Sequence, residues 1–104
     1  MDRGSTKREI EELIRRAVVP YSERPDAGAV GRLIDDLVTH GQVLHERVAA
    51  LAGDERTERA RAALAEWAYF VDAGPMGRGD HAHWNHARAL ARILRSLAAA
   101  PGAW

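Results

Sequence analysis

The residues best suited to chemistry are three histidines within six positions, in the segment HAHWNH at residues 81–86. Histidine is the commonest nitrogen ligand for divalent transition metals, and it also moves protons near neutral pH. On a helix His83 and His86 lie one turn apart and face together, whereas His81 points roughly 160° away from His83. At most two of the three therefore converge, and His83 and His86 form the predicted metal pair. The alternative is that these histidines cap, pack or face solvent.

A metal held by this pair needs further ligands from elsewhere in the chain. The other histidines, His40 and His45, lie too far along their predicted helix, because His40 is about 17 Å from that helix's start at 1.5 Å per residue. The carboxylates of Asp72 and Asp80 are better placed as third ligands. We expect the protein to hold no cofactor. The alternative is that it binds a divalent transition metal.

Large aromatic side chains gather around the same segment. Trp67, Tyr69 and Phe70 precede a loop rich in glycine that contains Met76, and Trp84 follows that loop. Such residues either close one end of a helical bundle as a hydrophobic cap or line a ligand pocket between facing helices. The second interpretation predicts a ligand site formed by Trp67, Phe70, His83, Trp84 and His86.

Arginines form a stripe at Arg88, Arg92 and Arg95, a pattern that can bind phosphate. The chain as a whole carries 15 basic and 15 acidic residues, so no net charge attracts a polyanion. Nucleic-acid binding is therefore a disfavoured alternative. No serine lies in a nucleophile motif, and adjacent carboxylates on a helix point about 100° apart. The sequence favours a role that is not enzymatic but leaves a catalytic one open.

The elements that position these residues are helices, because apolar residues recur with the helical period in every long segment. We predict an all-α protein, a four-helix bundle with a short N-terminal helix and three longer ones in up-down-up-down order. The predicted helices cover about residues 7–18, 29–52, 55–72 and 81–99, within a single domain at 1–104. The first helix packs either on its own chain or on a second copy.

The predicted second helix carries a seam of core-facing residues in which one position, Gly41, is glycine. Glycine inside a helix costs about 1 kcal/mol relative to alanine. Gly41 therefore predicts a close helix approach, or room for a bulky neighbour such as Trp67.

Capping residues predict where three of the helices begin. Thr6 and Glu9 have capping-box spacing, and Asp80 precedes the last helix. Gly53 and Asp54 form a very short turn that ends the second helix and caps the third.

Composition limits the setting in which the chain works. The absence of cysteine excludes disulfides and thiolate metal sites. No apolar run approaches the roughly 20 residues of a membrane-spanning helix, and the N-terminal segment does not match a secretory signal. The expected location is the cytoplasm, with no membrane contact.

The segments LVTHGQVLHERVAAL, ERARAALAE, PMGRG and HARALARILRSL resemble a family of small actinobacterial helical proteins of unknown function. Members are sometimes labelled natural-product biosynthesis proteins. The resemblance covers about two thirds of the chain, and its most specific piece is the last helix from His86 to Arg92. It implies a small helical fold and a link to specialised metabolism, and it transfers no catalytic residue.

These observations predict a helical accessory protein that acts through contacts with a second copy or another protein. One alternative is a bundle that binds a small molecule or metal at the aromatic and histidine end of the third and fourth predicted helices, which leaves open a role as a pathway enzyme. The other is a nucleic-acid-binding regulator.

Overall fold

The computed structural model describes the backbone of residues 3–104 and the side chains of residues 6–104. This part of the chain contains four α-helices and two short 3-10 helices, with no strand. In chain order they are α1 (Arg3–Ala17), η1 (Tyr21–Glu23), α2 (Ala27–Ala49), η2 (Gly53–Glu55), α3 (Glu58–Ala73) and α4 (Asp80–Ala98). The predicted all-α class and four-helix architecture are confirmed. None of the described helices is long and apolar enough to cross a membrane.

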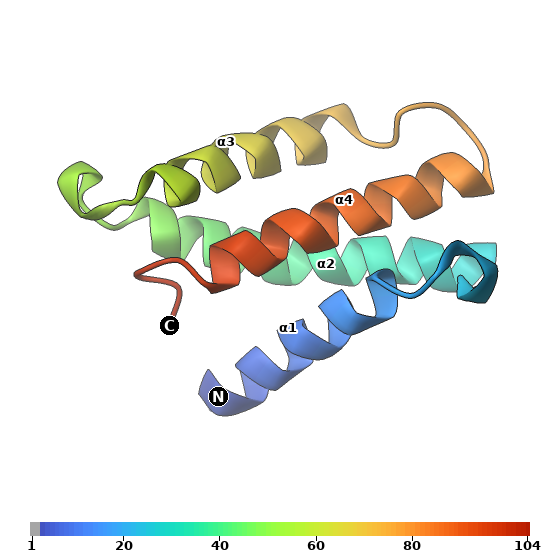
Figure 1. The fold of residues 1–104 in the computed structure, drawn as a ribbon, viewed down its shortest axis with the longest axis horizontal. Helices are drawn as coiled ribbons and strands as arrows, with labels where there is room; N and C mark the ends of the chain where they lie inside the picture. The colour runs from blue at the N-terminus through green and yellow to red at the C-terminus, as the bar shows by residue number, and fades with distance from the viewer. Residues whose placement is uncertain (1–2) are drawn as a thin grey trace.

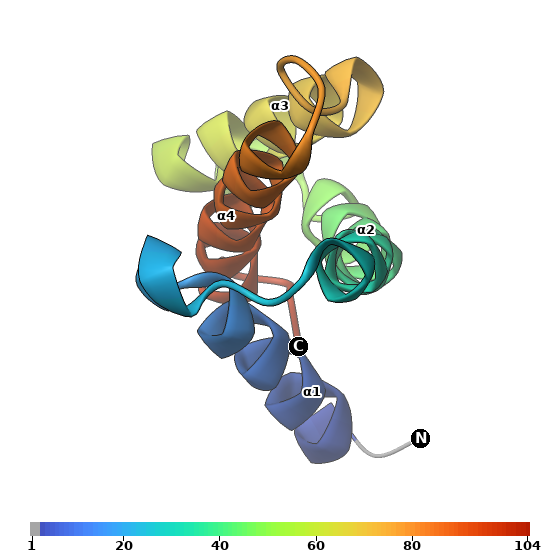
Figure 2. The same cartoon turned by 90° about the vertical axis from the view of Figure 1, so that its right-hand side faces the viewer.

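Successive helices run in alternating directions, so α2 and α4 are parallel (Figure 1). These two helices form the centre of the molecule, with α1 and α3 on opposite sides of the pair (Figure 2). Among the described residues α1 and α3 do not approach one another. The apolar face of α1 packs against α2 and α4 of its own chain, which buries Ile10, Leu13, Ile14 and Ala17.

The central place of α4 follows from its sequence. It contacts each of the other three helices, and its apolar residues lie on two adjacent faces rather than on one stripe. The buried residues of α4 are Trp84, His86, Ala87, Leu90, Ala91, Ile93, Leu94 and Leu97. The parallel partner α2 buries a single seam, formed by Val30, Leu33, Leu37, Gly41, Leu44 and Val48.

Gly41 makes room for Trp67 of α3, which is the second of the two outcomes that its position in the seam predicts. A Cβ atom added at Gly41 would lie 2.0 Å from the Cη2 atom of Trp67, so the indole ring occupies the space that any larger residue would need. Trp67 is 1% exposed, and its Nε1 donates a hydrogen bond to Oε1 of Gln42 at 2.9 Å. The neighbouring residue on α2 thus supplies the polar partner that a buried indole needs.

The helix starts differ from the predicted ones. α1 begins at Arg3, so Thr6 lies inside the helix rather than at its cap. α3 is capped by Thr57, whose side chain accepts a hydrogen bond from the backbone N–H of Ala60, and Asp54 lies in η2 instead. α4 is preceded by Gly79, and Asp80 is its first helical residue.

The connection between α2 and α3 is longer than the predicted short turn. Arg56 reaches back and donates hydrogen bonds to the carbonyl oxygens of Leu51, at 3.0 Å, and Ala49. These carbonyls lie where α2 ends and its last groups lack helical partners. Arg56 therefore stabilises the end of α2 from the following loop.

The C-terminal residues fold back onto the molecule. Nε1 of Trp104 donates to the carbonyl oxygen of Ala98 at 2.8 Å, and Arg47 donates to the carbonyl oxygen of Ala103 at 3.4 Å. The ammonium group of Lys7 on α1 lies 5.9 Å from the centre of the Trp104 ring. The C-terminal segment therefore joins α1, α2 and α4.

Candidate functional site

The three histidines of residues 81–86 lie at the end of the molecule where α2 and α4 begin, which is the right-hand end in Figure 1. The end of α3, η1 and the loop of residues 74–79 lie at the same end. Within that loop Gly77 and Gly79 have φ angles of 112° and 89°, a backbone conformation that glycine adopts without strain. The loop can therefore turn sharply into α4 and present its histidines.

The three histidines in the first turns of α4 lie in different environments. His81 is exposed, makes an edge contact with the ring of Tyr21 at 5.5 Å, and its Nε2 accepts a hydrogen bond from Nδ2 of Asn85 at 3.0 Å. His83 is exposed on a different cavity, and His86 is buried. The three side chains therefore do not form one cluster.

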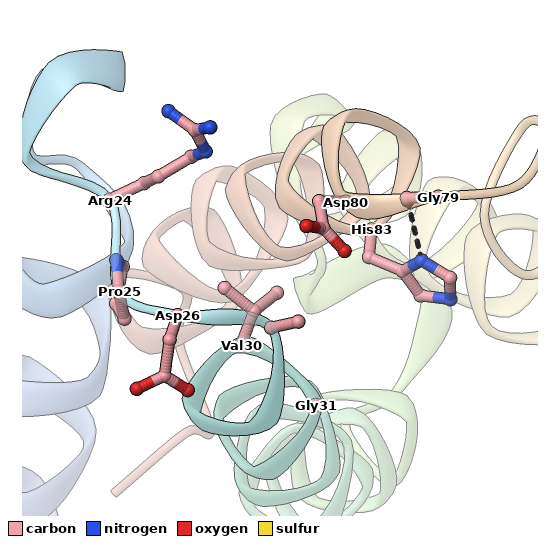
Figure 3. Close-up of a pocket in the computed structure, with 9 residues that line it drawn as sticks. Arg24, Pro25, Asp26, Val30, Gly31, Gly79, Asp80 and His83 are labelled. Carbon is pink, nitrogen blue, oxygen red and sulfur yellow. Dashed lines mark hydrogen bonds between the residues drawn. The ribbon is translucent and has the colours of Figure 1, made fainter.

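His83 lies at a cavity of about 600 Å³ between the starts of α2 and α4, which we call the η1 cavity (Figure 3). Nδ1 of His83 donates to the carbonyl oxygen of Gly79 at 2.7 Å. Figure 3 shows Arg24 and Asp80 on opposite sides of this space, with Val30 between them.

Most polar groups that line the η1 cavity already have partners within the chain. Asp26 caps α2 by accepting a hydrogen bond from the N–H of Ala29 at 2.9 Å. The guanidinium of Arg24 lies 4.0 Å from the centre of the Tyr21 ring and donates to the Tyr21 carbonyl oxygen. The η1 cavity is the larger space, but few of its polar groups are left for a ligand.

His86 lies at a smaller cavity of about 310 Å³ beneath the loop of residues 74–79, which we call the loop cavity. Its walls are Phe70, Met76, Gly77, Arg78, His81, Ala82, Asn85, His86 and Ala89. His86 is 6% exposed, and its ring centre is 6.4 Å from that of Phe70. Burial, with a smaller contribution from the nearby His83, lowers the pKa of His86 below its ordinary value. His86 is therefore neutral near pH 7.

The predicted ligand residues are divided among the core and these two cavities. Trp67 and Trp84 are 1% and 0% exposed and lie in the core. Phe70 and His86 line the loop cavity, and His83 lines the η1 cavity. The two tryptophans are covered by other core residues and do not line either cavity. Ligand binding by Phe70, His83 and His86 stays a prediction.

The metal prediction rests on His83 and His86 alone. Across residues 3–104, no group of three or more histidine, aspartate or glutamate side chains is arranged to hold a metal ion. Neither Asp72 nor Asp80 supplies a third ligand in this arrangement. A protein metal site normally has at least three such ligands, so this geometry does not fit a zinc-type centre.

The predicted arginine stripe forms part of a second surface feature, a groove between α1 and α4 that we call the α1/α4 groove. It is lined by Lys7, Glu11, Ile14, Arg15, Val18, Arg88, Ala89, Arg92, Arg95, Ala98 and Ala99. The aliphatic members form its floor, and Val18 is 43% exposed there. Sequence reasoning found the stripe on one helix and missed the groove, because α1 and α4 lie far apart in the sequence. The one sign of this groove in the sequence was Val18, an apolar residue just after α1.

No curated protein and no solved structure matches the chain. One family model matches residues 8–102, and that family is described only as being of unknown function. The actinobacterial origin and the link to natural products that the sequence resemblance implies stay predictions. Because the match covers nearly all of the chain, this protein belongs to the family of unknown function DUF6415.

Proposed function

We propose that the protein is a small interaction module that docks an acidic, amphipathic helical segment of a partner protein in the α1/α4 groove. The supporting observation is the composition of the groove, which combines an aliphatic floor with a cationic rim on a chain of no net charge.

The floor favours a protein partner over a nucleic acid. Val18 exposes 43% of its surface, and the partly exposed Ala89 and Ala98 continue the aliphatic surface along the groove. Removing apolar surface from water favours association. A helix that carries leucine-like side chains on one face gains this energy, whereas a phosphate backbone does not.

The rim favours acidic residues on that partner. Five cations line the groove and Glu11 is the one carboxylate among its lining residues. Arg15 pairs with Glu12, and Arg92 lies 3.4 Å from Glu66, but both pairs are exposed and therefore weak. Arg88 and Arg95 make no ion pair with any described residue. The excess positive charge steers an acidic segment to this surface.

The test uses synthetic peptides and the isotope-labelled protein. We expect an amphipathic peptide with leucines on one face and glutamates on the other to shift the NMR signals of groove residues. The same peptide with lysine in place of glutamate is expected not to bind. Val18→Asp and Arg95→Glu are expected to weaken binding of the acidic peptide about tenfold each, because each removes one part of the recognition.

Matched controls separate the groove from general surface effects. Val43 on α2 is also 43% exposed, so Val43→Asp introduces the same charge at an equally exposed valine. Arg59→Glu changes an exposed arginine on α3 in the same way. Both controls are expected to bind the peptide as the unaltered protein does. Circular dichroism checks whether all four variants fold.

Two results would overturn the proposal. Tighter binding of a short DNA duplex than of the acidic peptide, with steep loss in salt, would assign the arginine stripe to nucleic acid. A dimer in light scattering that Val18→Asp dissociates would assign the groove to a second copy of the chain. The predicted oligomer is tested by that same measurement.

A further inference from the structure

The loop cavity is built differently from the η1 cavity. Its walls are largely apolar, with the Phe70 ring, the Met76 side chain, Ala82 and Ala89 around the space. At about 310 Å³ it lies at the lower end of the range for small-molecule sites. A ligand of this site is therefore small.

His86 is the polar group that this cavity leaves without a partner. More than nine tenths of the residue is buried, and its ring borders the cavity. No hydrogen bond joins its ring nitrogens to any residue of the described chain. The ring nitrogens are not sealed from solvent, because Nε1 of Trp84 is the one fully buried side-chain nitrogen that lacks a partner among the described residues. They can therefore bond to a ligand that enters the cavity. Burial keeps the imidazole neutral, so it carries one donor and one acceptor.

The charge around the cavity comes from one residue. Arg78 is the charged side chain on its wall, and no aspartate or glutamate lines it. A guanidinium binds a carboxylate through two parallel hydrogen bonds, which an ammonium group cannot do. The cavity therefore favours a ligand with a negative group at the position of Arg78.

The aromatic wall favours a flat, unsaturated ligand. The rings of Phe70 and His86 are inclined by 32° with centres 6.4 Å apart, and aromatic groups associate at such separations. A thioether also makes favourable contacts with an aromatic ring, and the Met76 side chain is 79% exposed at the edge of the cavity. Both features select for an aromatic ring over an alkyl chain.

We propose that the loop cavity binds a small aromatic carboxylate, with its ring between Phe70 and Met76, a hydrogen bond to His86 and its carboxylate at Arg78. This site is independent of the α1/α4 groove, because the two share only Ala89 among their lining residues.

The test compares three probes of nearly the same shape. Benzoate carries a negative group, benzamide is its neutral counterpart and benzylamine carries a positive group. In NMR titrations we expect benzoate to shift signals of the loop and of the first turns of α4. Benzamide is expected to bind about tenfold more weakly, and benzylamine not measurably.

Three variants assign the contacts. Arg78→Gln is expected to weaken benzoate about tenfold and to leave benzamide unchanged, because it removes the charge alone. His86→Phe keeps a ring of similar size and removes both nitrogens, so it is expected to weaken benzoate and benzamide alike. Arg59→Gln, at an exposed arginine on α3, is the matched control and is expected to bind as the unaltered protein does.

The proposal is overturned if benzylamine binds as well as benzoate, or if Arg78→Gln leaves the benzoate affinity intact. Arg78 is exposed, so this variant tests the site even if His86→Phe fails to fold. Shifts confined to the η1 cavity would also contradict it. Peptide docking in the groove and benzoate binding in the cavity are measured with different probes, so either proposal can fail alone.

Discussion

The bundle buries one tryptophan in its middle and another at the end where α4 begins, and the two indole rings differ in their hydrogen-bond partners. In the middle, Gly41 gives up its side chain to make room for Trp67, and Gln42 accepts the hydrogen bond of the indole. At the end, Trp84 is equally buried, yet its Nε1 has no hydrogen-bond partner within the described chain. The middle is fully matched in shape and polarity, whereas the end leaves polar groups and space unused. Binding sites arise where such matching is incomplete.

The largest expected effect breaks the match in the middle. Gly41→Ala places a Cβ atom 2.0 Å from the Trp67 ring, and neither the ring nor the helix backbone can yield that far without cost. We expect a loss of about 3 kcal/mol in the free energy of unfolding, despite the better helix propensity of alanine.

The control lies on the same helix. Gly31 is exposed, and a Cβ atom there would meet nothing within 4 Å. Gly31→Ala is expected to stabilise the protein by about 0.5 to 1 kcal/mol, because only the propensity changes. Chemical denaturation measures both. Equal effects at the two positions would contradict the packing of the Trp67 ring against Gly41.

The second prediction compares the two tryptophans directly. Trp67→Phe loses both ring volume and the bond to Gln42, so we expect a destabilisation of about 2 kcal/mol. Trp84→Phe also loses volume but removes a buried donor that has no partner, so we expect a change below about 1 kcal/mol. Urea denaturation of both variants checks the order, and a larger loss at Trp84 would contradict it.

The smallest expected effect concerns His86 and pH. Its pKa is lowered in the folded protein, so the unfolded chain takes up a proton at a higher pH than the native one. The stability that neutral His86 contributes is fully present above the ordinary histidine pKa of about 6.5. It declines as pH falls from there toward the lowered pKa. We expect the melting temperature to drop as pH falls below about 6.5, and His86→Phe to reduce that drop.

Exposed His81 provides the comparison for this experiment. His81→Phe is expected to leave the pH dependence as it is. If both variants reduce it equally, the effect does not come from burial of His86.

The helical fold was predictable because helical periodicity is a local property. The seam of α2, the number of helices and the meeting of Gly41 with Trp67 all follow from spacing and residue size. The helix starts were less predictable, because Thr57 and Asp54 are both good caps and the path of the loop selects between them.

The candidate site was predictable only in its location. Spacing places His83 and His86 on one side of a helix, but the start of α2 lies at His83 and Phe70 of α3 lies at His86, so each histidine borders a different cavity. Trp67 and Trp84 lie in the core, since nothing in a single helix shows which aromatic residue its neighbours will cover. Arg78 went unnoticed because its role depends on how the loop folds over Phe70.

The contact between Lys7 and Trp104 bears on the order in which the chain folds. The central pair α2 and α4, with α3 packed on α4, closes loops shorter than the whole chain. α1 packs on α4 and reaches the C-terminal residue, so its docking closes a loop of nearly the whole chain and pays the largest closure entropy. Amide hydrogens of α1 are therefore expected to exchange by local opening before those of the central pair.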